Sequence, residues 1–132
     1  MIETAAMGDN DLLEMLASET DRRTPTIVEG VRALAGSSGP NAKGIEEIRV
    51  EAHGLKGAAM VVGQNHLSEL AKEIEVALVQ RLASGTIDPD LAAKIVGAIE
   101  AFQGGVQAAA RGEAEPASVG ESISTLSAEE PA

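Results

Sequence analysis

The residues best suited to carry chemistry lie in one short stretch, Ala52-His53-Gly54-Leu55-Lys56-Gly57, which holds one of the two histidines of the chain. On a helix, positions i, i+3 and i+4 share a face, so His53, Lys56 and Gly57 would form one patch. This patch would combine an imidazole, a neighbouring cation and a bare stretch of backbone. Because glycine costs about 1 kcal/mol against alanine in a helix interior, we infer that a large partner must come close to the imidazole.

An imidazole in this setting has several possible roles, and the sequence argues against two of them. A zinc site lacks ligands, because the chain has no cysteine, no Glu-x-x-His pair, and its second histidine, His66, lies beyond Gly63. A serine hydrolase would need a Gly-x-Ser-x-Gly turn, which is absent. Two interpretations stay open: a histidine without a chemical role, and a histidine that is itself the nucleophile for a phosphoryl group. In the second, Lys56 supplies positive charge for the phosphoryl oxygens and Gly57 leaves room for the donor.

Two long helices should position this patch. Asn41 can cap a helix over residues 42–62, in which apolar residues recur at alternating steps of three and four. These residues are Ile45, Ile48, Ala52, Leu55, Ala59 and Val62. His53 lies about 100° around the helix from Ala52, which places it on the flank of the buried face. Gly63 can end this helix, and a second one over residues 65–83 follows, with a leucine-rich apolar face.

Weaker signals indicate helices on either side of this hairpin. A short N-terminal helix would carry Leu12, Leu13 and Leu16. Thr24 and Pro25 then predict a new helix start, with threonine as N-cap and proline at the first position. Whether these two segments are separate helices or one kinked helix stays open. Asp88-Pro89 predicts the start of the last helix, and no strand pattern is present. We therefore expect an all-α fold, an antiparallel up-down four-helix bundle with an additional short N-terminal helix.

Composition narrows the classes of partner. Ten basic and 21 acidic residues give a net charge of −11, which argues against nucleic acid and anionic membranes. No stretch has the apolar length of a signal peptide or a membrane span, so we expect a soluble cytoplasmic protein. We expect residues 1–8 to be a flexible N-terminus, residues 9–111 to form the bundle, and residues 112–132 to be a disordered acidic tail.

The motif Ala-His-x-Leu-Lys-Gly, followed by a helix-ending glycine and a leucine-rich second helix, resembles the histidine-containing phosphotransfer (HPt) domain. The matching residues are Ala52, His53, Leu55, Lys56, Gly57, Gly63, Leu67, Leu70 and Ile74. The resemblance implies a four-helix bundle in which His53 is the phosphoacceptor, Lys56 neutralises the phosphoryl group and Gly57 clears the approach. It also implies a polar residue facing the imidazole from the second helix, and this position falls on Glu75. Glu75 would either accept the ring N–H or be a solvated carboxylate.

Two positions depart from the family pattern. Ala58 stands where the family commonly has a small hydroxyl residue, so a contact from this position to the phosphoryl group is missing. Gly54 adds a second weak point to the helix, and the sequence offers no reason for it.

A docking surface for a partner should surround the histidine. Val50 and Met60 share its helix face, and Arg49, Lys56 and Gln64 lie at the edges. An apolar centre with a polar rim is typical of a transient interface. In the alternative, Val50 and Met60 pack against the N-terminal helix.

The resemblance implies a phosphocarrier of a multistep two-component phosphorelay. His53 would accept a phosphoryl group from a receiver-domain aspartate and pass it to another, so the partners would be receiver domains of response regulators or of a hybrid histidine kinase. The chain has no Gly-rich nucleotide motif, so we expect a carrier and not a kinase. We also expect a monomer without a bound cofactor, because the receiver's own carboxylates would hold the Mg²⁺. Two alternatives stay open: a helical interaction module without phosphotransfer activity, and a fragment of a kinase dimerisation domain. In that fragment an acidic residue would normally follow the histidine, whereas here Gly54 does.

Overall fold

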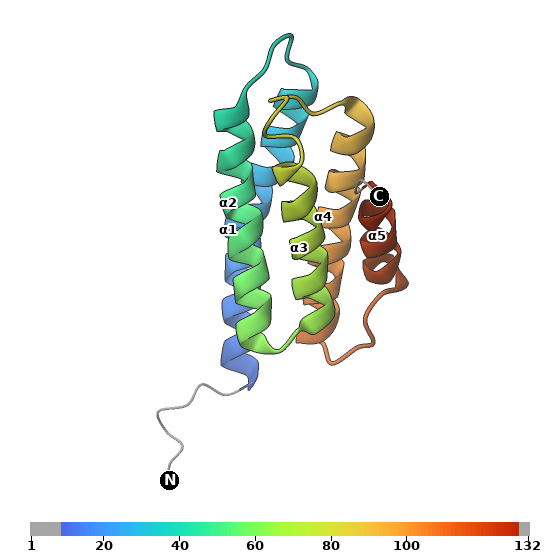
Figure 1. Cartoon of the computed structure of the whole chain (residues 1–132). Helices are drawn as coiled ribbons and strands as arrows, with labels where there is room; N and C mark the ends of the chain where they lie inside the picture. Colours follow the sequence, from blue (N-terminus) through green and yellow to red (C-terminus); the bar gives the residue numbers. More distant parts are fainter. Residues whose placement is uncertain (1–8, 130–132) are drawn as a thin grey trace.

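The computed structural model describes residues 9–129, which form five helices and no strand. Helices α1 to α4 run alternately up and down, and α1 also packs against α4, so the four close into a bundle (Figure 1). The bounds are α1 Asp9–Ala35, α2 Ala42–Val62, α3 Asn65–Val79, α4 Pro89–Ala110 and α5 Ala117–Ser127. The predicted all-α, antiparallel bundle is confirmed. None of these five helices combines the length and apolar character needed to cross a bilayer.

The core is built from the apolar faces of the helices. On α2, the five residues of the predicted apolar face from Ile45 to Ala59 are buried, and Val62 packs at the edge of the core. Phe102 of α4 is fully buried, and aliphatic side chains fill the remaining space. Because the buried set is rich in alanine, the helices can approach closely.

The α2–α3 hairpin has the predicted start and turn. The side chain of Asn41 accepts a hydrogen bond from the N–H of Gly44 at 2.9 Å, which caps α2. Gly63 ends the helix in the left-handed region, with φ 81°, where glycine is favoured. Helix α3 begins two residues later and runs back alongside α2, which is the longer of the two helices (Figure 1).

Helix α1 continues through Pro25, so the predicted additional N-terminal helix is wrong. Thr24 does not cap a new helix: it is buried, and its hydroxyl donates to the carbonyl oxygen of Thr20 at 2.8 Å. A proline inside a helix costs about 3 kcal/mol, because it removes a hydrogen bond and crowds the preceding turn. Helix α1 tolerates this cost because apolar residues are buried on both sides of the proline, among them Leu16 and Ile27.

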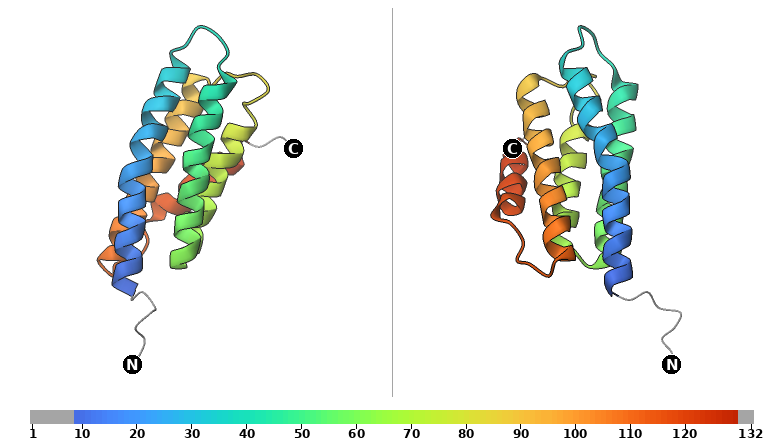
Figure 2. Two further views of the ribbon diagram at one scale, coloured as in Figure 1. Left: turned by 90° about the vertical axis from the view of Figure 1, so that its left-hand side faces the viewer. Right: turned by 180° about the vertical axis from the view of Figure 1, so that it is seen from behind.

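The predicted disordered tail is also wrong for residues 117–127, which form α5. This helix packs on the outside of α3 and α4, away from α1 and α2 (Figure 2). Val119 and Leu126 are buried there, and the ammonium group of Lys94 on α4 bonds the Glu129 carboxylate at 2.6 Å. A helix with so few apolar residues is stable only against a preformed surface, which local composition does not reveal. The predicted flexible N-terminus, residues 1–8, lies outside the described residues, as do residues 130–132.

Candidate functional site

His53 lies near the middle of α2, on the flank that faces α3, and its side chain is 60% exposed. Its Nδ1 atom lies 3.1 and 3.2 Å from the two carboxylate oxygens of Glu75 on α3. An ionised carboxylate can only accept hydrogen bonds, so in the neutral imidazole this contact places the proton on Nδ1. The Nε2 atom then keeps its lone pair, and within residues 9–129 no side chain bonds to it. The arrangement is that of an oriented, accessible nitrogen nucleophile.

Glu75 contacts the other charged residues of the site. Besides the imidazole, its carboxylate binds Arg49 Nη1 at 2.7 Å and Lys56 Nζ at 3.2 Å, and both partners come from α2. The Glu75 side chain is only 13% exposed, and this burial by itself raises its pKa. Hydrogen bonds from His53, Lys56 and Arg49 outweigh the burial, so the pKa of Glu75 lies below its ordinary value. Glu75 is therefore ionised at neutral pH, and it is not merely a solvated carboxylate.

Arg49 is bound on two sides. Its Nε and Nη2 atoms donate to the two carboxylate oxygens of Glu46, at 2.8 and 2.7 Å, while Nη1 donates to Glu75. These hydrogen bonds, that to Glu46 first, raise the pKa of Arg49 further above its already high ordinary value despite partial burial. The sequence predicted Arg49 at the edge of a docking surface; in the structure its guanidinium is engaged within the site.

Gly54 and Gly57, which stand on either side of Leu55 and Lys56, have different surroundings. A methyl group added at Gly57 would meet no heavy atom within 4 Å, so packing within the chain gives no reason for glycine there. A methyl group at Gly54 would instead collide with the guanidinium of Arg23 on α1. That guanidinium is held by Glu51 at 2.8 Å and by Glu19 at 3.0 Å. Gly54 thus has a packing reason, which the sequence could not show because Arg23 comes from another helix.

Exposed apolar side chains lie on α2 and α3, the helices that carry His53 and Glu75. Among the described residues, the exposed large hydrophobic ones are Val50, Met60 and Val61 on α2 and Val79 on α3. Val50 and Met60 were predicted for a docking surface, and the alternative, in which they pack against the N-terminal helix, does not hold because they are 47% and 62% exposed. Val61 and Val79 were not predicted. Val79 lies four residues after Glu75, so the helical repeat places it on the same face of α3 and could have indicated it.

The remaining predicted residues lie at the margins of the site. Gln64 precedes α3 and is half-buried, without a side-chain hydrogen bond that caps the helix. Ala58 is half-buried and packs at the edge of the core. The second histidine, His66, begins α3 and bonds Glu115, just before α5, at 2.8 Å. That bond raises the pKa of His66. Within residues 9–129, His66 is hydrogen-bonded to a carboxylate and to no lysine or arginine that could bind a phosphoryl group.

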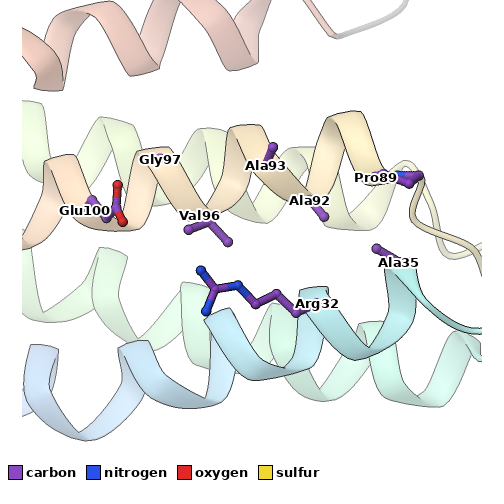
Figure 3. Close-up of a pocket in the computed structure, with 8 residues that line it drawn as sticks. All are labelled: Arg32, Ala35, Pro89, Ala92, Ala93, Val96, Gly97 and Glu100. Carbon is purple, nitrogen blue, oxygen red and sulfur yellow. The ribbon is translucent and has the colours of Figure 1, made fainter.

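A groove of about 420 Å³ lies between α1 and α4, on the side of the bundle away from the α2–α3 pair (Figure 3). Its walls are mostly small and apolar, with Arg32 and Glu100 as the charged residues. It holds no histidine and shares no residue with the His53 site. Within the described part of the chain, no group of histidine and acidic side chains is arranged to hold a metal ion.

A search of curated proteins found no match to this sequence. The family model described as "Hpt domain" matches residues 11–110, which extend from α1 to the end of α4 and include His53 and Glu75. The match covers well over half of the 132 residues. It agrees with the resemblance carried by the motif around His53, and the chain belongs to the Hpt domain family of phosphotransfer proteins.

Proposed function

We propose that this chain is a phosphocarrier in a multistep two-component phosphorelay. His53 accepts a phosphoryl group from the aspartyl phosphate of one receiver domain and passes it to the aspartate of another. Hpt domains have a phosphotransfer role in two-component signalling, and the observation that carries the assignment is the contact between His53 Nδ1 and Glu75, which leaves an exposed Nε2. The carrier works as a monomer in the cytoplasm and needs no nucleotide of its own.

The transfer follows from the tautomer of His53. The Nε2 lone pair attacks phosphorus, the bond from phosphorus to the aspartate oxygen breaks, and the electron pair leaves with the carboxylate. The proton stays on Nδ1, so the ring becomes positively charged, and the ionised Glu75 stabilises that charge, as a buried aspartate does for the histidine of a catalytic triad. In the onward step an aspartate oxygen of the second receiver attacks phosphorus, the nitrogen–phosphorus bond breaks with its electron pair returning to Nε2, and the ring is neutral again.

Lys56 is placed to contact a phosphoryl group on His53. Its ammonium group makes a single ion pair in the site, with Glu75 at 3.2 Å, and its side chain is 27% exposed. It lies one helical turn from His53, within the reach of a long, flexible side chain. When the phosphoryl group arrives, Lys56 turns from Glu75 to the phosphoryl oxygens, which carry more negative charge than a single carboxylate.

The receiver docks on the exposed face of α2. Val50, Met60 and Val61 supply apolar contact area, and Gly57 keeps the backbone bare between them. Val79 extends this surface onto α3, and Gln64 lies at its margin. A few exposed apolar side chains with charged residues around them suit a short-lived complex, which a relay needs because one carrier must release its donor before it meets its acceptor.

The test is transfer of a labelled phosphoryl group. The full chain is incubated with a purified receiver domain that carries radiolabelled aspartyl phosphate, and the label on the chain is assayed for acid lability, the property of a phosphorus–nitrogen bond. We expect acid-labile label on the wild type and none on His53→Gln. The matched control is His66→Gln, which removes the other histidine and should take up label normally. Phosphoramidate, a small-molecule donor, tests the reactivity of His53 without any docking. Absence of label with both donors, or label that persists in His53→Gln, would defeat the assignment.

A further inference from the structure

A continuous series of charged groups leads from the exposed side of α2 to His53. Glu46 holds Arg49 through two hydrogen bonds, Arg49 binds Glu75 at 2.7 Å, and Glu75 accepts from the imidazole. Arg49 crosses from α2 to α3, and its side chain is 24% exposed against 60% for His53. Arg49 thus contacts Glu75, which orients the nucleophile, and is not hydrogen-bonded to His53 itself.

The two cations that bind Glu75 are held differently. Lys56 has one contact of 3.2 Å in the site, whereas Arg49 makes three hydrogen bonds of 2.7 to 2.8 Å to two carboxylates. Paired, planar hydrogen bonds of this kind fix an arginine in place, and a lysine ammonium has no equivalent geometry. Arg49 is thus suited to stay in place while Lys56 moves.

This difference matters when a phosphoryl group reaches His53. Glu75 is a partly buried anion beside the atom that must take up an anionic group, and like charges repel strongly where water is excluded. If Lys56 turns to the phosphoryl oxygens, Arg49 is the cation that continues to neutralise Glu75. Without it, Glu75 would be drawn to compete for Lys56 or to take up a proton, and the Nδ1–H would lose its ionised acceptor.

We propose that Arg49 is a positioning residue for the transfer. It keeps Glu75 ionised and aimed at His53 Nδ1, so that Lys56 is released for the phosphoryl group; Glu46 anchors it. This inference rests on the proposed function for its effect on transfer. Its effect on the imidazole, however, exists in the protein alone and can be measured without any partner.

The test measures the two effects separately. Nitrogen-15 NMR of the His53 ring reports the fraction of neutral imidazole with the proton on Nδ1, and the labelled receiver reports the rate of transfer. In Arg49→Gln, we expect a smaller Nδ1–H fraction and transfer slowed about tenfold, the lower end of the loss found when an outer partner that orients a functional histidine is removed. Arg49→Lys restores the charge without the paired geometry, so both readouts should fall between those of the wild type and Arg49→Gln. The matched control is Arg22→Gln, since Arg22 also pairs with a glutamate on its own helix, Glu19, but lies on α1.

Each outcome has a definite meaning. An unchanged Nδ1–H fraction in a folded Arg49→Gln protein overturns the positioning role. A changed fraction with wild-type transfer overturns it as well, because the orientation would then have no consequence. If the wild type itself takes up no label while the fraction still depends on Arg49, the proposed function fails and the link from Arg49 to the imidazole stands. Thermal unfolding of each variant separates these outcomes from loss of the fold.

Discussion

Replacing Gly57 by alanine should make the protein more stable and a worse phosphocarrier. A methyl group at this position meets no heavy atom within 4 Å, so it has no steric cost in the free protein. The free energy of unfolding should then rise by the full difference in helix propensity between glycine and alanine, about 1 kcal/mol. For a domain of this length, that gain raises the melting temperature by roughly 3–5 °C.

In the proposed function, the same methyl group would stand in the path of the donor to Nε2, because Gly57 lies one helical turn from His53. Phosphoryl transfer needs the donor phosphorus about 3–3.5 Å from the nucleophile and in line with it, and a displacement of about 1 Å can slow such a reaction about 100-fold. We therefore expect Gly57→Ala to accept the phosphoryl group from a receiver about 100 times more slowly. Reaction with phosphoramidate, a much smaller donor, should change far less, because that donor does not need the cleared backbone.

Gly97→Ala is the matched control for this experiment. Gly97 lies inside α4 and is exposed, and a methyl group there would also meet no heavy atom within 4 Å beyond the adjoining backbone of its own helix, but Gly97 belongs to the α1–α4 groove (Figure 3). It should give the same rise in melting temperature with wild-type transfer. The assays are calorimetric or CD-monitored unfolding and single-turnover transfer of label. A Gly57→Ala protein that is stabilised and still transfers at the wild-type rate would refute the claim that Gly57 serves the partner.

Three further predictions concern the packing and charges around the site. Gly54→Ala should change stability by less than about 0.5 kcal/mol, since the gain in propensity is offset by displacement of Arg23; in an Arg23→Ala background the full gain of about 1 kcal/mol should return. A double-mutant cycle by urea unfolding measures this coupling. Glu75→Gln should slow transfer, and its unfolding free energy should fall less on acidification than that of the wild type. The folded-state pKa of Glu75 lies below its ordinary 4.5, so its contribution is present above pH 4.5 and is lost as the pH falls through the lower, folded-state value. Leu126→Ala should cost about 2 kcal/mol or more of unfolding free energy, because Leu126 is 1% exposed.

Each of these predictions has an outcome that contradicts it. Additive effects of Gly54→Ala and Arg23→Ala would mean that the arginine does not occupy the space beside the glycine. Identical acid-unfolding curves for the wild type and Glu75→Gln would mean that Glu75 is not stabilised in its ionised form. A Leu126→Ala protein as stable as a control with exposed Thr125→Ala would indicate that α5 adds nothing to the bundle.

The fold could be predicted wherever the determining signals lie close together in the sequence. Helix α2 begins at the predicted residue because Asn41 caps it, and it ends as predicted because Gly63 can adopt a positive φ. The signal at Thr24-Pro25 was just as local, but it was overridden because α1 buries side chains on both sides of the proline. Helix α5 escaped prediction for the opposite reason: it has only 11 residues and few large apolar side chains, so its stability comes from the surface of α3 and α4.

The same contrast between local signals and contacts from other helices applies to the site. The position of Glu75 was implied by the resemblance to the HPt family, and the contact with His53 forms because α2 and α3, joined by a short turn, have a fixed register. The interactions of Arg49 and Arg23 could not be predicted, because each joins residues 26 or 28 positions apart and depends on a choice among several nearby carboxylates. Charged pairs of this kind are decided by side-chain packing and not by the helical repeat.

The two glycines beside the histidine make the same point about function. In sequence, Gly54 and Gly57 are equally costly within α2, and each suggests a close approach. The space beside Gly54 is taken by Arg23 of the same chain, whereas the space beside Gly57 is empty. A glycine whose absent side chain is replaced by another part of the protein serves the fold. A glycine that leaves open space beside an exposed nucleophile lowers the stability of the free protein without any internal compensation, and in the proposed function the docked partner offsets that cost.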